Sequence, residues 1–535
     1  MLPFQAMSQT LWRRSAVWRQ IMTFLTICFV VGVFTQSRRV ESAPVKPRQH
    51  PNIVLIMADD LGYGDLSCYG AGSLRTPSID KLATEGIRFT SGYCSASTCT
   101  PTRYSMLTGT YAFRGKRTGI APPNAPAIIK PGTETVASIL QRAGYVTGVI
   151  GKWHLGLGGA KGPDWNGDLK PGPLEIGFDT CFLLPTTNDR VPQVYVHDHR
   201  VPNLDPDDPL WVGNTKPNPE HPTGLTHRRS LKMDWSHGHH ATIHNGISRI
   251  GFYTGGHAAR FRDEDLADQW IDQSIQFMET HRHEPFFLFF SSHDTHVPRM
   301  PHERFQGKSQ LGYRGDAILQ LDWCVGRLLE TLDRLQLAQD TLVIFCSDNG
   351  PVLDDGYQDG ALEKNGNHRA AGPFSGGKYS VYEGGTRTPF ITRWRGRIVP
   401  AVSQQVVCTI DLAASLAALT AQPLLPDSCL DSFNVLDALL GRGNGRSHLV
   451  QQNNGTNGTY ALRKGDWKLH RYDRQVARNV VVEAQLANKK VPRFQLFRLS
   501  DDPEEEVNLI DEFPDVAKEL QETLREIIAG GRSRP

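Results

Sequence analysis

Four short runs of apolar residues along the chain predict buried β-strands. They cover residues 52–57 (N-I-V-L-I-M), 145–150, 285–290 and 342–346, and polar positions are nearly absent from them. Continuous apolar runs of this length are typical of strands that a sheet buries on both faces. We therefore expect four strands at these positions, in the interior of one sheet.

A period close to 3.6 residues predicts helices between these strands. Residues 316–337 repeat apolar side chains on one face, as expected for a helix that packs on a sheet. Residues 76–86 begin with Thr-Pro and end at a glycine, which are the start and stop signals of a short helix, and another is predicted over 136–144. This alternation indicates an α/β fold with a central, mostly parallel sheet flanked by helices.

The chain changes character after about residue 420. Pro- and Gly-rich spacers precede a predicted hairpin at 460–470, a short strand at 494–499 and a terminal helix at 514–528. We therefore expect a large α/β domain over 50–420 and a small C-terminal α+β subdomain over 421–535, which combines an antiparallel sheet with the terminal helix.

The N-terminus has the pattern of a secretory signal. Arg13, Arg14 and Arg19 precede an apolar run at 21–34, and small residues follow near position 43. The run is shorter than the roughly 20 residues that span a bilayer, so a cleaved signal peptide over 1–43 is favoured over a retained anchor. This predicts a secreted or periplasmic protein without a stable membrane span.

Composition narrows the functional classes. The 535 residues carry a net charge of only +2, so the chain offers no basic field for nucleic acid. Its nine cysteines form no CxxC pair, and leaving out Cys28 and Cys99 gives an odd number, which argues against a complete disulfide framework. Cys324 and Cys346 fit packed thiols, and the sequence leaves open whether one or two disulfide bridges form among the others.

Two N-x-T glycosylation sequons occur, at Asn454 and Asn457.

Polar residues follow the predicted strands at the point where each strand ends. Asp59 and Asp60 come after the first strand, and Asp348 and Asn349 come after the strand at 342–346. In open α/β sheets the ligand crevice lies outside the carboxyl ends of the strands, so these side chains should converge. Three carboxylates with an amide oxygen favour a hard divalent cation, calcium or magnesium rather than zinc.

Cys99 is placed at a predicted helix start. Pro101 suits the first position of a helix that runs through Leu107, which would put the cysteine at the positive end of the helix, a natural anion site. Arg103 could fold back toward the cysteine and add a fixed positive charge. On spacing alone, a packed cysteine without a chemical role remains the alternative.

These residues occur within motifs that resemble those of the sulfatase family. C-T-P-T-R followed by L-T-G, beginning at Cys99, is similar to the first sulfatase signature, although Thr102 stands where serine is commoner. G-Y-V-T-G-V-I-G-K-W-H is similar to the second signature and supplies Lys152 and His154. T-H-V-P supplies His296, and the segment G-G-K-Y-S-V-Y-E-G-G-T-R-T-P is similar to the sulfatase lysine loop and supplies Lys378.

The resemblance implies the alkaline phosphatase-like fold and a set of cofactors. In sulfatases a maturation enzyme oxidises the signature cysteine to formylglycine, whose hydrate is the nucleophile, and a calcium ion is bound. A formylglycine-generating enzyme and a sulfated substrate are therefore the expected partners. The implied catalytic residues are Cys99, Arg103, Lys152, His154, His296 and Lys378, and the implied calcium ligands are Asp59, Asp60, Cys99, Asp348 and Asn349.

The implied reaction is hydrolysis of a sulfate monoester, an arylsulfatase-like activity. A hydroxyl of the hydrated formylglycine, polarised by calcium, attacks sulfur while Lys152, Lys378 and His296 neutralise the sulfate oxygens. Lys378 or His296 protonates the leaving alcohol, and Arg103 steadies the nucleophile. His154 then takes the proton of the second hydroxyl, which releases sulfate and restores the aldehyde.

The Pro-, Gly- and His-rich segment at 158–261 is expected to form long loops over the active face and to select the substrate. Its histidines at 237–244, which include His244, could line a sugar pocket, bind a metal or lie in a plain surface loop. The candidate substrate-contacting residues are Asn188, Asp189, Arg190, His237, His239, His240 and, from the segment before His296, His293.

Three functions compete at this point. The favoured one is a sulfatase that acts on sulfated carbohydrate or aryl sulfate. A phosphate or phosphonate monoester hydrolase of the same architecture is the second, because a shared fold does not settle the substrate. The third is a glycan-binding protein without catalysis, which the presence of every catalytic motif residue disfavours.

Overall fold

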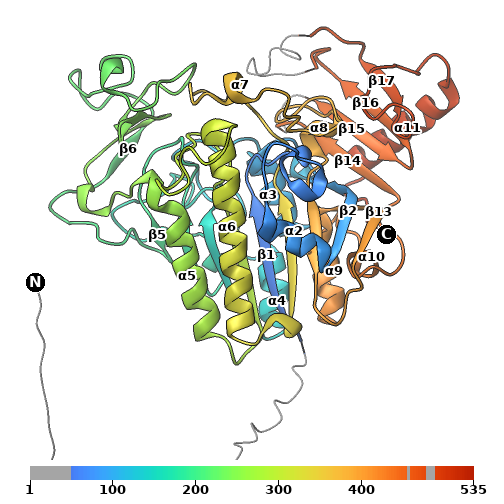
Figure 1. Ribbon diagram of the computed structural model, residues 1–535, viewed down its shortest axis with the longest axis horizontal. Helices are drawn as coiled ribbons and strands as arrows, with labels where there is room; N and C mark the ends of the chain where they lie inside the picture. Colours follow the sequence, from blue (N-terminus) through green and yellow to red (C-terminus); the bar gives the residue numbers. More distant parts are fainter. Residues whose placement is uncertain (1–49, 455–457, 478–488, 535) are drawn as a thin grey trace, which may run out of the picture. The chain divides into compact units, whose positions relative to one another are not determined.

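The computed structural model describes residues 50–454, 458–477 and 489–534 (Figure 1). The predicted signal peptide over 1–43 and the sequon at Asn457 lie outside these residues. None of the helices in the described ranges is both long enough and apolar enough to cross a membrane.

The predicted central mixed sheet is present, and it has nine strands in the described residues. Its order is β13-β2-β12-β11-β1-β10-β3-β4-β5. β1 pairs in parallel with β10 and β11, whereas β12 is antiparallel to both of its neighbours. The strands are β1 (Asn52–Ala58), β2 (Ile87–Tyr93), β3 (Val146–Lys152), β4 (Thr180–Leu184), β5 (Val196–His197), β10 (Phe286–Ser291), β11 (Thr341–Ser347), β12 (Phe390–Arg393) and β13 (Ala401–Cys408).

Successive side chains of β1 enter two separate cores, which explains why its sequence is apolar at every position. Ile53 and Leu55 pack with α3, α4 and α9, whereas Val54 and Ile56 pack with α2, α5 and α6. α5 and α6 cover the near face of the sheet in Figure 1. The helices are α2 (Pro77–Thr84), α3 (Cys99–Thr108), α4 (Val136–Arg142), α5 (Leu266–Thr280), α6 (Gly312–Arg334) and α9 (Leu412–Leu419).

The segment at 158–261 contains more regular structure than predicted. β4 and β5 extend the central sheet, β4 in parallel with β3, so the expectation of loops throughout was wrong for these two strands. β4 has only five residues and lies between Pro- and Gly-rich stretches, so its apolar run is too short to predict a strand from the sequence. Two small ribbons complete the segment, β6 (Trp211–Gly213) with β9 (Phe252–Thr254) and β7 (Ile243–His244) with β8 (Ile247–Ser248).

The predicted C-terminal antiparallel sheet and terminal helix are present at the upper right of Figure 1. α11 (Pro514–Ala529) packs Leu520 and Leu524 into the core of this sheet. β14 also reaches the loop that precedes Cys99, because the Ser97 N–H donates to the Gln452 carbonyl at 2.9 Å. The strands are β14 (His448–Gln452), β15 (Thr459–Lys464), β16 (Trp467–Tyr472) and β17 (Phe494–Arg498).

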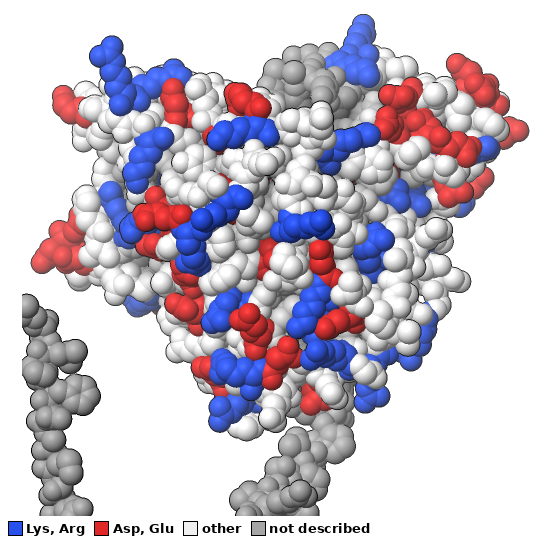
Figure 2. Space-filling model, in the orientation of Figure 1, with Lys and Arg blue, Asp and Glu red and all other residues white. Residues whose placement is uncertain are grey.

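Cysteines and surface charge agree with the sequence interpretation. The eight cysteines of the described residues are all free thiols, and Cys324 and Cys346 are buried as predicted. On the face shown in Figure 2, basic and acidic side chains are interspersed over most of the surface. This face therefore shows no extended field of one sign.

Candidate active site

The carboxyl ends of β1 and β11 bring three aspartates together. Asp59 and Asp60 follow β1, Asp348 follows β11, and each is fully buried. One carboxylate oxygen from each lies within 4.8 Å of the others. Asp60 has φ of +57°, and its N–H donates to the Asp348 carboxylate at 3.3 Å, so a backbone turn directs these acidic groups into one cluster.

Three cations surround this acidic cluster. Lys152, at the end of β3, is hydrogen-bonded to Asp59, and Arg103 Nε donates to Asp348 at 2.9 Å. Arg103 also donates to the Ser291 hydroxyl at 2.6 Å, which fixes its guanidinium over the acidic group. Lys378 Nζ donates to Asp60 at 2.8 Å, so the three aspartates each have a cationic partner.

The cations do not satisfy the acidic cluster completely. Burial, reinforced by the charge of Asp348, raises the pKa of Asp59 well above its usual range even though Lys152 opposes this shift. Burial likewise raises the pKa of Asp60. Asp59 Oδ1 and Asn349 Oδ1 are buried and have no hydrogen-bond partner among the described residues. These two oxygens could each coordinate a metal ion, and they lie among carboxylates that repel one another. The arrangement therefore fits a hard divalent cation.

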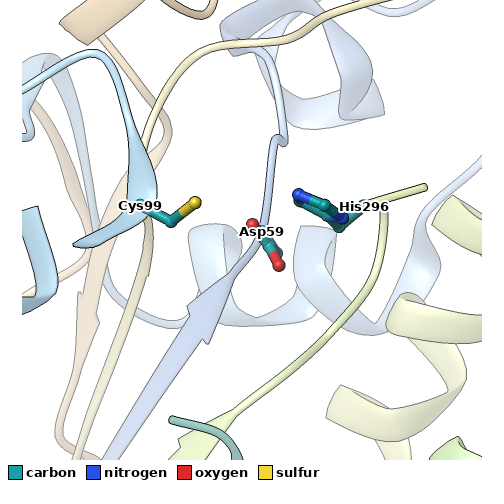
Figure 3. Close-up of side chains that lie close together, drawn as sticks. All are labelled: Asp59, Cys99 and His296. Carbon is teal, nitrogen blue, oxygen red and sulfur yellow. The ribbon is translucent and has the colours of Figure 1, made fainter. Parts of the chain in front are cut away.

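Cys99 is the first residue of α3, with Thr98 at the N-cap. Pro101 is therefore the third helical residue, and its predicted place at the first position was wrong. Proline is tolerated there because N–H groups of the first turn have no intrahelical acceptor. The sulfur of Cys99 points toward Asp59 and His296, and atoms of the three side chains lie within 4.8 Å of one another (Figure 3).

Burial raises the pKa of the Cys99 thiol, although Lys152 and Lys378 oppose the shift. Nucleophilic cysteines need the thiolate, which a positive environment and partial exposure normally provide. Cys99 is only 2% exposed, so the unmodified side chain is a poor nucleophile near neutral pH. The position suits a group that does not depend on thiol ionisation.

Two buried histidines lie near the acidic cluster in neutral form. Burial, and then the charge of Lys152, lowers the pKa of His154 well below its usual range, and burial also lowers that of His296. His154 Nε2 lies 3.1 Å from the Ala121 carbonyl, so this nitrogen carries the proton. His154 Nδ1 is buried without a partner among the described residues, which leaves it free to accept a proton.

The sequence interpretation missed a fourth carboxylate. Asp355 accepts a hydrogen bond from Lys378 Nζ at 2.7 Å and another from the Tyr379 hydroxyl at 2.9 Å. Lys378 therefore bridges Asp60 and Asp355, and burial notwithstanding, these two carboxylates raise its pKa well above the usual range. Asp355 lies in a loop after β11 with no periodic pattern, so only its spacing from Asp348 could have drawn attention to it.

Part of the predicted substrate-contacting set lies together at one side of the site. Asp189 accepts hydrogen bonds from Arg190 at 2.8 Å and from His239 Nε2 at 3.0 Å. The His239 ring packs against Tyr357 with ring centroids 4.6 Å apart. The histidine-rich segment is thereby attached to the loop that carries Asp355.

Other members of that predicted set have structural partners. Asn188 Nδ2 donates to the His296 carbonyl at 3.2 Å, and His293 Nδ1 accepts from the Trp270 indole at 3.1 Å. His240 packs against Trp235. His237 lies near Asp354, 3.9 Å away, with 42% of its side chain exposed. His244 lies between the Phe261 carbonyl and the Tyr253 hydroxyl, and burial lowers its pKa to about 4.

Comparison with known proteins identifies a family. The sequence profile described as Sulfatase matches residues 51–422. The chain is 47% identical to an N-acetylgalactosamine-6-O-sulfatase of Bacteroides thetaiotaomicron, over 92% of this chain and 96% of that protein. It is 32% identical to arylsulfatase A of Homo sapiens, over 89% and 87% of the two chains.

Solved structures of similar fold include members of the same family. One from a study of glycosaminoglycan metabolism by Bacteroides thetaiotaomicron has a TM-score of 0.86 and 47% identity, covering 90% of this chain and 99% of that one. The phosphonate monoester hydrolase of Agrobacterium radiobacter has a TM-score of 0.55 at 16% identity, covering 90% and 96%. The second likeness concerns the fold alone.

Proposed function

The chain belongs to the sulfatase family, and from this premise we propose that it removes the 6-O-sulfate of an amino sugar by means of a formylglycine formed at Cys99. Its class, a sulfate ester hydrolase of sulfated carbohydrates, follows from the similarity over most of its length. The proposed amino sugar and sulfate position rest on the activity named for the 47% identical relative, and the proposed formylglycine and calcium chemistry rests on the unsatisfied acidic cluster beside the buried Cys99.

We assign Asp59, Asp60, Asp348 and Asn349 to a calcium ion, with position 99 as a further ligand. The ligand atoms are oxygens, and two of them have no hydrogen-bond partner among the described residues. Burial raises the pKa values of Asp59 and Asp60 in spite of their lysine partners. Calcium, when bound, would offset this negative charge and act as a Lewis acid toward the sulfate oxygens.

The roles of the histidine, lysine and arginine side chains follow from their protonation states and their positions in the site. Formylglycine, when formed, supplies a hydroxyl that can attack sulfur and a second one whose proton must leave before sulfate is released. His154 Nδ1 is the unprotonated atom suited to take that proton. Lys152 and Lys378 neutralise the sulfonyl oxygens. Arg103 holds Asp348 in place.

The two candidates for protonating the leaving alcohol differ in protonation state. His296 Nδ1 lies 2.7 Å from the Val297 carbonyl and carries the single proton of a neutral ring, so Nε2 has none to give. Lys378 is kept charged by Asp60 and Asp355. We therefore assign the proton donor to Lys378, and sulfate binding to His296.

Substrate selection is assigned to Asp189, Arg190 and His239 at the side of the site. Their mutual hydrogen bonds present a fixed set of polar groups, which suits hydroxyl and amide groups of a sugar. The proposal also includes the N-terminal signal over 1–43, maturation by a formylglycine-generating enzyme, and division into domains at 50–420 and 421–535.

The test compares kcat/KM on four substrates with protein matured in the cell. We expect N-acetylgalactosamine 6-sulfate to be hydrolysed at least tenfold faster than its 4-sulfate isomer, and an aryl sulfate faster than the matching aryl phosphate. Preference for the 4-sulfate would overturn the sugar assignment. Preference for the phosphate would support the phosphate ester hydrolase that shares this fold.

A further inference from the structure

A cavity borders the active site on the side of His154. It is a groove of about 1030 Å³ whose walls come from the segments 116–131 and 158–160 together with Pro171 and Asn454. One wall is Ala121, whose carbonyl accepts from His154 Nε2 at 3.1 Å and whose N–H donates to the Thr100 hydroxyl at 3.1 Å. The groove is therefore joined by direct hydrogen bonds to the proposed proton acceptor and to the residue next to Cys99.

The charged residues that line the groove are all basic. They are Lys116, Arg117 and Lys130, and the lining contains no aspartate or glutamate. Each of the three is exposed, and within the described ranges none of them forms an ion pair. Exposed arginines elsewhere in the protein commonly form ion pairs; Arg304, for example, lies 2.6 Å from Asp268.

The rest of the groove is mainly apolar side chain and backbone. Ile120, Pro122, Pro126 and Ile128 provide aliphatic surface, and the glycines at 158 and 159 contribute backbone without side chains. Aliphatic surface with a few polar groups at its margin suits the C–H face of a sugar ring. The volume lies at the upper end of the range for ligand pockets, which leaves room for more than one sugar unit.

We propose that this groove is a subsite for an anionic sugar unit attached to the sugar that carries the scissile sulfate. This inference rests on the proposed function, because it places a second unit of the same substrate. Three cations that form no ion pair within the described residues, in a groove lined by no carboxylate, complement a polyanionic chain. The shared chemistry is a negative group on the neighbouring sugar, either the carboxylate of a uronic acid or a second sulfate.

The first test removes the positive charge and compares two substrates. The variant is Lys116→Ser, Arg117→Ser and Lys130→Ser combined, and the matched control replaces three exposed basic residues elsewhere, Arg75→Ser, Lys308→Ser and Lys518→Ser. The substrates are N-acetylgalactosamine 6-sulfate and the disaccharide in which a uronic acid is attached to it. We expect the groove variant to lose about tenfold in kcat/KM on the disaccharide, through KM, and far less on the monosaccharide.

Carboxyl-reduced and doubly sulfated disaccharides then separate the two sources of charge. A loss that disappears with the carboxyl-reduced sugar assigns the groove to the uronate, whereas a loss that grows with the second sulfate assigns it to that sulfate. An equal loss on both original substrates, or kcat/KM on the disaccharide within twofold of the control variant, would overturn the subsite.

A binding measurement separates failure of the subsite from failure of the proposed function. Calorimetry on Cys99→Ala protein, with and without the three groove substitutions, uses a uronate-containing hexasaccharide bearing 6-sulfate on each amino sugar. We expect the groove substitutions to weaken binding about tenfold, with a difference that shrinks at high salt. Unchanged affinity would contradict the groove even if the enzyme hydrolysed none of these sugars.

Discussion

Two buried clusters of charged residues in this protein differ in how completely they are satisfied. One is the acidic cluster at the carboxyl ends of β1 and β11, and the other joins the central sheet to the C-terminal sheet. In the second, which we call the C-terminal charge cluster, Lys468 lies 2.8 Å from Glu383 and 2.9 Å from Glu505. All three of these side chains are fully buried.

In the C-terminal charge cluster every carboxylate oxygen has a partner. Glu383 binds Lys468 through one oxygen and the Tyr93 hydroxyl, at 2.5 Å, through the other. Glu505 binds His470 at 2.8 Å and accepts the Glu383 N–H at 2.5 Å. Burial opposes ionisation of Glu383, but Lys468 and two arginines hold its pKa well below the usual range.

The contrast shows how a ligand site can be distinguished from a structural network. In the active site, the pKa values of Asp59 and Asp60 are raised, and Asp59 Oδ1 and Asn349 Oδ1 have no hydrogen-bond partner among the described residues. In the C-terminal charge cluster, each carboxylate oxygen has a partner and the pKa of Glu383 is lowered. Unsatisfied buried polar atoms are costly, and those of Asp59 and Asn349 lie beside two further carboxylates, an arrangement that fits a bound cation. The following substitutions should therefore affect activity in the first region and stability in the second.

The largest effect is expected for Cys99→Ala in the active site. Removal of the proposed nucleophile should lower kcat by about 10⁴-fold or more while the melting temperature stays nearly constant. The matched control is Cys94→Ala, which removes another buried thiol five positions earlier and should retain activity. Steady-state kinetics and thermal melting measure both, and substantial turnover by the Cys99 variant would contradict the assignment.

A large effect on stability is expected for Lys468→Met. The change leaves two buried carboxylates without their shared cation and should cost about 3–5 kcal/mol of unfolding free energy. Lys464 lies on the neighbouring strand β15 and forms an exposed ion pair with Glu519 of α11, so Lys464→Met should cost less than about 1 kcal/mol. Urea titration compares them, and equal losses would show that the C-terminal charge cluster is not under strong electrostatic constraint.

Removal of calcium should affect only the active-site region. At a free concentration 100 times the dissociation constant, binding to the folded state adds about 2.7 kcal/mol of stability, which a chelator should abolish. Asp60→Asn should remove this calcium-dependent stabilisation, whereas Asp411→Asn, at a buried carboxylate paired with Arg446, should retain it. The measurement is the melting temperature of each variant with and without calcium. A calcium-dependent stabilisation that persists in Asp60→Asn would contradict the proposed ligand set.

The smallest expected effect is a pH dependence from the C-terminal charge cluster. The pKa of Glu383 is lowered in the folded protein, so its contribution to stability is present above the unfolded value of about 4.5 and is lost as pH falls below it. Unfolding free energies between pH 6 and pH 3 should fall less steeply in Glu383→Gln than in the unsubstituted protein. Identical slopes would mean that Glu383 does not carry this dependence.

The sequence predicted the strands that position the site and the polar residues at their ends. β1 and β11 are continuous apolar runs, so the amino-acid pattern alone places Asp59 and Asp348 at one edge of the sheet. Asp355 could not be placed, because its hydrogen bond to Lys378 joins two loops without a periodic pattern. For the same reason, the sequence could not show which histidines of the 237–244 segment lie at the site. His239 contacts Asp189 there, whereas His244 lies between Tyr253 and Phe261.

The most direct test of the account is the mass of the tryptic peptide that spans residues 89–103, from protein matured in its own host or with a co-expressed maturation enzyme. This peptide contains Cys94 as an internal control beside Cys99. The account predicts formylglycine at position 99 alone, which lowers the mass because an aldehyde oxygen replaces the thiol sulfur and two hydrogens are lost. Unmodified cysteine at position 99 in protein that hydrolyses sulfate esters would contradict it.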